Sequence, residues 1–263
     1  MRAWCFLLIL AAGCRDSTAG GDDDGTPTPT GNGTVFDPAI TNVTLEIDYE
    51  TGQEPYTGPI LGFGDTFDLT ATNLDRVFAG TKTLTIPRTL GEMQDIGTIA
   101  DEELTTEDLL AIADAHRDRA NTATERTYYL VFVSGHFADA SGVQEGVLGV
   151  SLGTTGVIAM FKDTIRSTDV PGLPNVVRYV EQSTIVHEGA HAIGLVANGV
   201  PMVSVHQDTE HGAHCNNDRC VMYYLNEGAA DAAAFVQQQV LTGNTILFDA
   251  SCLADVDALT GGP

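Results

Sequence analysis

Residues 175–195 read NVVRYVEQSTIVHEGAHAIGL, and the rest of the sequence is interpreted outward from this stretch. It lacks proline, and Val176, His187 and His191 recur on one side at helical spacing, which predicts a helix that ends near Gly194. The letters HEGAH form an HExxH pattern. Because four residues make slightly more than one helical turn, both imidazoles project the same way and can share one metal ion.

Glu188 follows the first of these histidines directly. A carboxylate in that position can hold a water molecule activated by the metal and act as its general base. The plain alternative is a surface helix with two incidental histidines. That alternative is disfavoured because the helix is otherwise mostly apolar, and buried histidines need partners.

Two histidines do not complete a catalytic zinc site, which has three protein ligands and an open position. The downstream stretch offers further donors, namely His206, His211, His214 and Glu227. Any of the three histidines could be the third ligand on this criterion alone.

The same stretch resembles the metzincin metalloproteases, whose extended motif is HExxHxxGxxH followed by a methionine turn. His187, Glu188, His191 and Gly194 match that motif, and Ala197 stands where the third histidine belongs.

More narrowly, the segment beginning at His214 resembles the archaemetzincin pattern, in which the third histidine precedes Cys, four residues and Cys-x-Met. Cys215, Cys220 and Met222 reproduce that pattern. The chain differs by an insertion at 195–213 and by lacking the later CxxC pair. The resemblance implies zinc held by His187, His191 and His214, with Met222 as an apolar floor beneath it.

The implied fold is α+β: a zincin/metzincin-like mixed β-sheet with packed helices, an active-site helix and a methionine turn. The implied function is an exported zinc-dependent endopeptidase that hydrolyses peptide bonds, with Glu188 as general base. Tyr224 matches the Met-x-Tyr of some metzincins, which implies that its hydroxyl stabilises the oxyanion. An extended peptide or protein substrate would pair with an edge strand from 146–161, just before the active-site helix.

Three alternatives stay open. Asn226, Glu227 and Asp231 resemble the NExxxD helix of thermolysin-like enzymes, which would make the chain a gluzincin-type peptidase with Glu227 as third ligand. A catalytically inactive zincin-fold surface binding lipoprotein would keep the fold without turnover. A zinc-storing surface protein would use the seven histidines as several weak sites.

The remainder of the chain from residue 40 alternates between strand and helix patterns. Strands are expected at 43–50, 81–87 and 127–135, and two more within 146–161. Helices are expected at 66–80, from 105 onward, and at 175–195 and 228–240.

The N-terminal residues MRAWCFLLILAAGC predict a signal peptide at 1–14 whose end resembles the bacterial lipobox, with Cys14 lipidated. Residues 15–36, rich in Gly, Asp, Thr and Pro, predict a flexible tether. The metallopeptidase domain is expected at 37–263. This organisation predicts an exported protein, lipid-anchored at the bacterial cell envelope or extracellular.

Composition limits the partners. The 263 residues carry 36 acidic and 12 basic side chains, a net charge of −24, which disfavours nucleic acid and anionic membrane surfaces. No uninterrupted apolar run reaches the length of a spanning helix, so contact with a membrane is expected only through the lipid. The protein is also expected to be a monomer. A disulfide between Cys215 and Cys220 is expected, with Cys252 either free and buried or an alternative partner.

Overall fold

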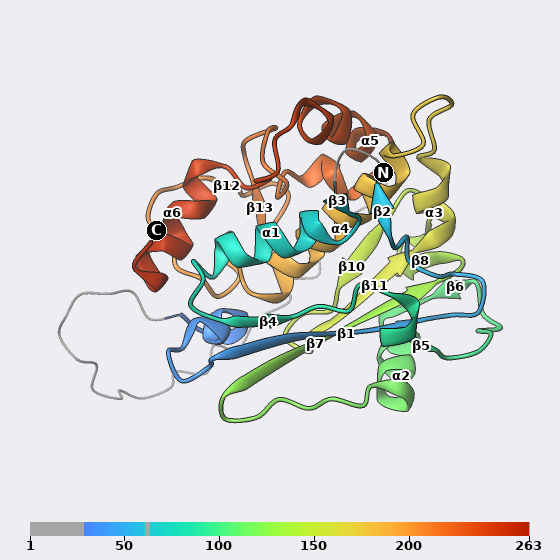
Figure 1. The fold of residues 1–263 in the computed structure, drawn as a ribbon, viewed down its shortest axis with the longest axis horizontal. Helices are drawn as coiled ribbons and strands as arrows, with labels where there is room; N and C mark the ends of the chain where they lie inside the picture. Colours follow the sequence, from blue (N-terminus) through green and yellow to red (C-terminus); the bar gives the residue numbers. More distant parts are fainter. Residues whose placement is uncertain (1–28, 61–63, 263) are drawn as a thin grey trace, which may run out of the picture.

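The computed structural model describes residues 29–60 and 64–262 (Figure 1). The predicted signal peptide and most of the predicted tether lie outside these residues. The central sheet has the order β10-β11-β7-β1-β4, and β5 pairs with the same edge of β1 as β4 does. Its strands are β1 (Asn42–Tyr49), β4 (Thr83–Thr85), β5 (Gln94–Asp95), β7 (Glu125–Val133), β10 (Gly149–Ser151) and β11 (Val157–Phe161).

The sheet is mixed, because β10 runs antiparallel to β11 whereas the other pairs are parallel. Helices cover both of its faces (Figure 1). The helices are α1 (Asp68–Val77), α2 (Thr106–His116), α3 (Lys162–Ser167), α4 (Val176–Ala192), α5 (Ala229–Gln238) and α6 (Ala250–Thr260). Helices α1, α4, α5 and α6 lie on one face and α2 on the other. The predicted α+β class with a mixed sheet and packed helices is therefore confirmed.

Strand β7 is buried on both faces of the sheet. Its apolar run has no polar face: Tyr128, Leu130 and Phe132 pack in the core beneath α4, while Tyr129 and Val131 pack in the core beneath α2. A strand buried on both faces reads as a continuous apolar run, and residues 127–135, where a strand was expected, are such a run.

Shorter elements complete the chain. The small strands are β2 (Pro59–Ile60), β3 (Gly64–Asp65), β6 (Glu103–Leu104), β8 (His136–Asp139), β9 (Gly142–Gln144), β12 (Gln207–Asp208) and β13 (His214–Cys215). The 3₁₀ turns are η1 (Gly31–Phe36), η2 (Leu90–Glu92), η3 (Tyr224–Glu227) and η4 (Val240–Thr242). Within the described ranges, no helix is long and apolar enough to cross a bilayer.

The structure differs from the sequence interpretation at the start of the folded domain. Residues 31–36, predicted to belong to the tether, form η1 and bury Val35 and Phe36 in the core. Phe36 lies 5.3 Å from Phe78 between ring centroids, which fastens this turn to the end of α1. The folded part of the chain therefore begins before residue 36, and the predicted boundary of the tether at residue 36 is wrong.

A buried ion pair joins the helix that carries HExxH to the preceding helix. The Lys162 ammonium in α3 contacts the Glu181 carboxylate in α4, and both side chains are almost fully excluded from solvent. The backbone amide of Tyr56 donates to the other oxygen of Glu181 at 2.7 Å, and the Tyr56 ring lies 3.9 Å from the ammonium. These partners compensate the cost of burying two charges and fix the position of α4.

Gly194 follows the C-terminal end of α4, where the chain comes very close to the N-terminal segment. Its φ of +94° belongs to the left-handed region, and a Cβ there would lie 2.7 Å from the backbone nitrogen of Gly33. Only glycine fits such a position. The N-terminal segment therefore crosses directly over the end of α4.

Candidate metal centre

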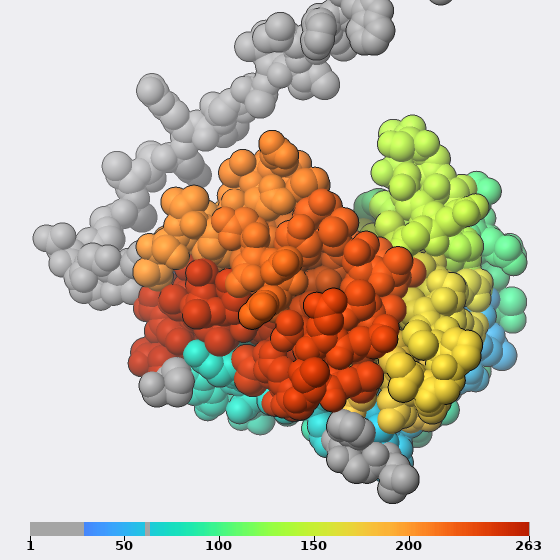
Figure 2. All heavy atoms as spheres, turned by 90° about the horizontal axis from the view of Figure 1, so that it is seen from above, coloured from blue at the N-terminus to red at the C-terminus, as the bar shows by residue number. Residues whose placement is uncertain are grey.

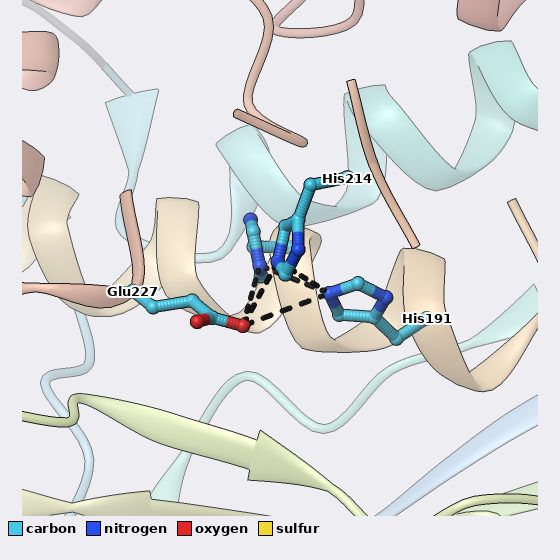
Figure 3. Close-up of side chains that lie close together, drawn as sticks. His191, His214 and Glu227 are labelled. Carbon is cyan, nitrogen blue, oxygen red and sulfur yellow. Dashed lines mark hydrogen bonds and ion pairs between the residues drawn. The ribbon is translucent and has the colours of Figure 1, made fainter. Parts of the chain in front are cut away.

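The imidazoles of three histidines lie close together beside the C-terminal end of α4 (Figure 3). His191 Nε2 lies 3.1 Å from His187 Nε2 and 3.2 Å from His214 Nε2. His187 and His191 come from successive turns of α4, whereas His214 begins β13. Helical periodicity brings the first two together, and tertiary structure brings the third.

The outer nitrogens of two rings are held by backbone carbonyls. His187 Nδ1 donates to the Val221 carbonyl at 2.7 Å, and His214 Nδ1 donates to the His211 carbonyl at 2.6 Å. Because a carbonyl can only accept, each Nδ1 carries a proton and each Nε2 faces its neighbours, where it would offer a lone pair to a metal ion. This is the arrangement of metal-binding histidines, whose second nitrogen is fixed by a hydrogen bond.

The turn after Cys220 supplies one of these carbonyls and contains the buried Met222. The Asn226 side-chain amide donates to the carbonyls of Cys220 and Val221 at 3.0 and 3.1 Å. The Met222 carbonyl accepts from the Cys215 amide at 2.8 Å. The turn is thus tied both to η3 and to the strand that carries His214.

Glu227 joins the imidazoles from η3. Its Oε1 lies 2.9 Å from His214 Nε2, 3.6 Å from His187 Nε2 and 3.9 Å from His191 Nε2 (Figure 3). Although burial raises its pKa, hydrogen bonds from His187 and His214 outweigh this and hold the pKa of Glu227 well below its usual range. The sequence offered His214 and Glu227 as alternatives, and the structure brings both to the same point.

Glu188 is buried beside this cluster, and its Oε1 has no hydrogen-bond partner. Burial is the main cause that raises the pKa of Glu188, to about 7. A buried, unpartnered carboxylate oxygen is costly, so it marks a place where another group belongs. Water or a substrate in the adjoining cleft would satisfy it.

The cleft beside the cluster has a volume of about 370 Å³. Figure 2 shows it as a notch between the β8–β9 hairpin and the C-terminal part of the chain. Its walls include β10, the edge strand of the sheet, and its base includes Glu188, His191, His214 and Glu227. A larger cavity of about 580 Å³ lies along β1 and includes none of these residues.

The other predicted site residues lie elsewhere. His206 Nε2 contacts Asp255 Oδ2 at 2.7 Å, and His211 Nδ1 contacts Asp208 at 2.7 Å. The Tyr224 ring stacks on His211 with centroids 3.6 Å apart, and Tyr224 is not among the residues that line the cleft.

The predicted disulfide between Cys215 and Cys220 is not formed. Both residues and Cys252 are buried free thiols. Hydrogen bonds from the other two thiols are the main cause that lowers the pKa of Cys215. The alternative expectation for Cys252, free and buried, is the one the structure shows.

His206, Cys215, Asp249 and Cys252 make a second donor cluster, and the Cys220 thiol lies beside it. Cys252 Sγ lies 3.5 Å from Cys220 Sγ and 3.8 Å from His206 Nδ1. One donor atom from each of His206, Cys215, Asp249 and Cys252 lies within 4.8 Å of the others. The sequence analysis assigned the thiols to a disulfide and counted His206 only among the candidates for the third ligand of the other site.

Both clusters fit zinc by their donors. Zinc–nitrogen bonds of about 2.0–2.1 Å put the corners of a tetrahedron about 3.3 Å apart, and bonds to sulfur put thiolates about 3.7 Å apart. The imidazole spacings of 3.1 and 3.2 Å, and the spacing of 3.8 Å between Cys252 Sγ and His206 Nδ1, are close to these values. Histidine and cysteine are the donors that zinc prefers.

Comparisons with known proteins concern the fold. No protein-family model matches the sequence, and no curated protein matches it significantly. The structure is similar to that of archaemetzincin from Methanopyrus kandleri, with 12% identity, a TM-score of 0.44, and coverage of 85% of this chain and 97% of that one. It is also similar to that of a zinc-dependent peptidase from Methanocorpusculum labreanum, with 13% identity, a TM-score of 0.42, and coverage of 81% and 99%.

Proposed function

We propose that this protein is a zinc-dependent endopeptidase whose zinc is bound by His187, His191 and His214. One observation carries the proposal: three imidazole nitrogens converge at the base of a cleft that also contains the unpartnered carboxylate oxygen of Glu188. Imidazole donors and an adjoining carboxylate are the parts required for hydrolysis by a metal-activated water.

When bound, zinc would polarise the scissile carbonyl and make water acidic enough to lose a proton near neutral pH. Glu188 accepts that proton on its unpartnered Oε1 and delivers it to the leaving amine. The Val221 and His211 carbonyls keep two imidazoles in the required tautomer throughout.

Strand β10 is the proposed docking edge for the substrate. It ends the sheet order, so among residues 29–60 and 64–262 only its edge toward β11 is paired. Residues Gly149–Ser151 line the cleft beside Glu188. An extended peptide that adds to this edge would lie across the imidazole cluster. Tyr224 stays a proposed oxyanion-stabilising residue, although it would have to leave its stack on His211 to act.

The test is a peptide-library digest by the zinc-loaded full chain, with a chelator-treated sample beside it. The proposal expects cleavage that stops on chelation and returns with zinc. A binding protein of the same fold would retain zinc and cleave nothing.

The second cluster is proposed to hold a structural zinc through His206, Cys215, Asp249 and Cys252, with Cys220 packed beside them. It fastens the 195–213 insertion and α6 to the turn that carries Met222. Asp255 orients His206 from α6, as the carboxylates behind zinc-binding histidines do. Two tight zinc ions per chain are expected, whereas a zinc-storing protein would take up several weakly.

Export and lipid anchoring stay proposals that are supported by residues 1–14, which end in LAAGC. Mass spectrometry of the mature protein from a bacterial membrane fraction would test them. A lipid-modified N-terminal Cys14 is expected, and an unmodified N-terminus at another residue contradicts the anchor.

A further inference from the structure

The side chain of Glu227 makes contacts that a catalytic zinc site with three histidines does not need. Its Oε1 lies within 4 Å of all three imidazole nitrogens: 2.9 Å from His214, 3.6 Å from His187 and 3.9 Å from His191. The carboxylate is therefore shared among the donors rather than paired with one histidine.

These spacings describe the fourth corner of a tetrahedron. Zinc with nitrogen and oxygen ligands at about 2.0–2.2 Å has corners about 3.3 Å apart. The two imidazole spacings of 3.1 and 3.2 Å and the three spacings to Glu227 bracket that value. A catalytic zinc keeps this fourth position open for water, whereas a zinc with four protein ligands is closed.

The backbone of Glu227 is held while its side chain stays near solvent. The Leu148 amide donates to the Glu227 carbonyl at 3.1 Å, and Gly228 forms a bridge with Val147. Asn226 is tied to the methionine turn. The Glu227 side chain is nevertheless 42% exposed at the cleft, so rotation about its side-chain bonds can carry the carboxylate away without moving the backbone.

We propose that Glu227 is a fourth protein ligand that closes the coordination sphere of the zinc and must swing out before the site can accept water or substrate. This inference rests on the proposed zinc site and adds its regulation. It slows turnover by the folded protein without abolishing it, because the same carboxylate that strengthens zinc binding competes with every ligand that enters the cleft.

The closed site predicts two effects of opposite sign for Glu227→Gln, which keeps the shape but replaces a charged ligand with a weak amide donor. Zinc affinity of this site, measured by competition with a chelator, falls at least about tenfold because one ligand is lost. Affinity for acetohydroxamate, measured by calorimetry on the zinc-loaded full chain, rises at least about tenfold because nothing has to be displaced.

Glu210→Gln is the matched control, because Glu210 is an exposed carboxylate in the same loop as His214 and the charge change is identical. This control changes neither affinity. His191→Ala abolishes acetohydroxamate binding, which assigns that signal to this site and not to the thiol cluster.

Unchanged zinc and acetohydroxamate affinities in Glu227→Gln overturn the ligand role, and the same holds if both affinities fall together. If both shift as expected while neither wild type nor variant cleaves any peptide, the ligand role stands and the peptidase function fails. If wild type cleaves peptides and Glu227→Gln alters neither affinity, the peptidase function stands and the ligand role fails.

Discussion

His187 Nδ1 donates a hydrogen bond of 2.7 Å to the carbonyl of Val221, and this contact joins α4 to the turn that contains Met222. The two residues are far apart in sequence, and the bond fixes which ring nitrogen faces the other histidines. The turn therefore acts on the site through backbone geometry as well as through the apolar side chain of Met222, which is buried beside it.

Asn226→Ala tests that connection. The change removes two hydrogen bonds to the carbonyls of Cys220 and Val221 and should lower the free energy of unfolding by about 1–3 kcal/mol. Zinc affinity should fall with it, because the Val221 carbonyl is no longer fixed. Urea unfolding and chelator competition measure the two effects. The exposed Asn216→Ala serves as control, and equal losses in both variants would contradict the assignment.

Glu188→Gln tests the general base. Cleavage should fall by about 10²–10⁴-fold, the typical contribution of a positioned base. Because the Glu188 carboxylate is buried with an unpartnered oxygen, the neutral amide should also raise the melting temperature of the metal-free protein. Circular dichroism and a peptide digest give both readouts. Full cleavage by this variant would remove Glu188 from the mechanism.

Cys252→Ser and His206→Ala test the second zinc. Each should reduce the stoichiometry from two zinc ions per chain to one, because each removes a donor of the second cluster. Elemental analysis of dialysed protein gives the count. His211→Ala, which changes an exposed histidine outside both clusters, should leave it at two. A count of one in the wild type would contradict the second site.

Lys162→Met tests the buried ion pair between α3 and α4. Removing one partner leaves the Glu181 carboxylate buried without its cation and should cost about 3–5 kcal/mol of stability. The double variant Lys162→Met/Glu181→Leu should recover most of the loss, because no uncompensated charge remains. Urea unfolding compares the three proteins, and a double variant as unstable as the single one would refute this account.

Asp48→Asn tests a pH dependence away from the site. Burial raises the pKa of Asp48 to about 6, although the Tyr129 hydroxyl donates to it at 2.8 Å. Between about pH 4 and pH 6 the folded state keeps a proton that the unfolded state has lost, so raising the pH across this window destabilises the fold.

Asp48→Asn should be more stable than wild type at pH 7, by about 3 kcal/mol at most, and should lose that advantage at pH 4. Urea unfolding at both pH values measures the difference. A constant difference between Asp48→Asn and wild type at the two pH values would contradict the raised pKa.

The sequence by itself determined the elements and the first half of the site. Apolar runs, alternation and capping residues specified β1, β7, α2 and α4, because these signals depend on neighbours only a few positions away. HExxH at helical spacing placed His187 and His191 on one side of α4, and no tertiary contact is needed for that.

Only the tertiary structure decided what completes each cluster. The sequence had offered His214 and Glu227 as alternative ligands. They lie in contact because β13 and η3 both come to the C-terminal end of α4. His206 meets Cys252 because the insertion folds back onto α6. Polar composition at 31–36 indicated a tether, yet Phe36 packs on Phe78. In each case the deciding contact joins segments that are distant in the chain, and local sequence patterns do not predict such contacts.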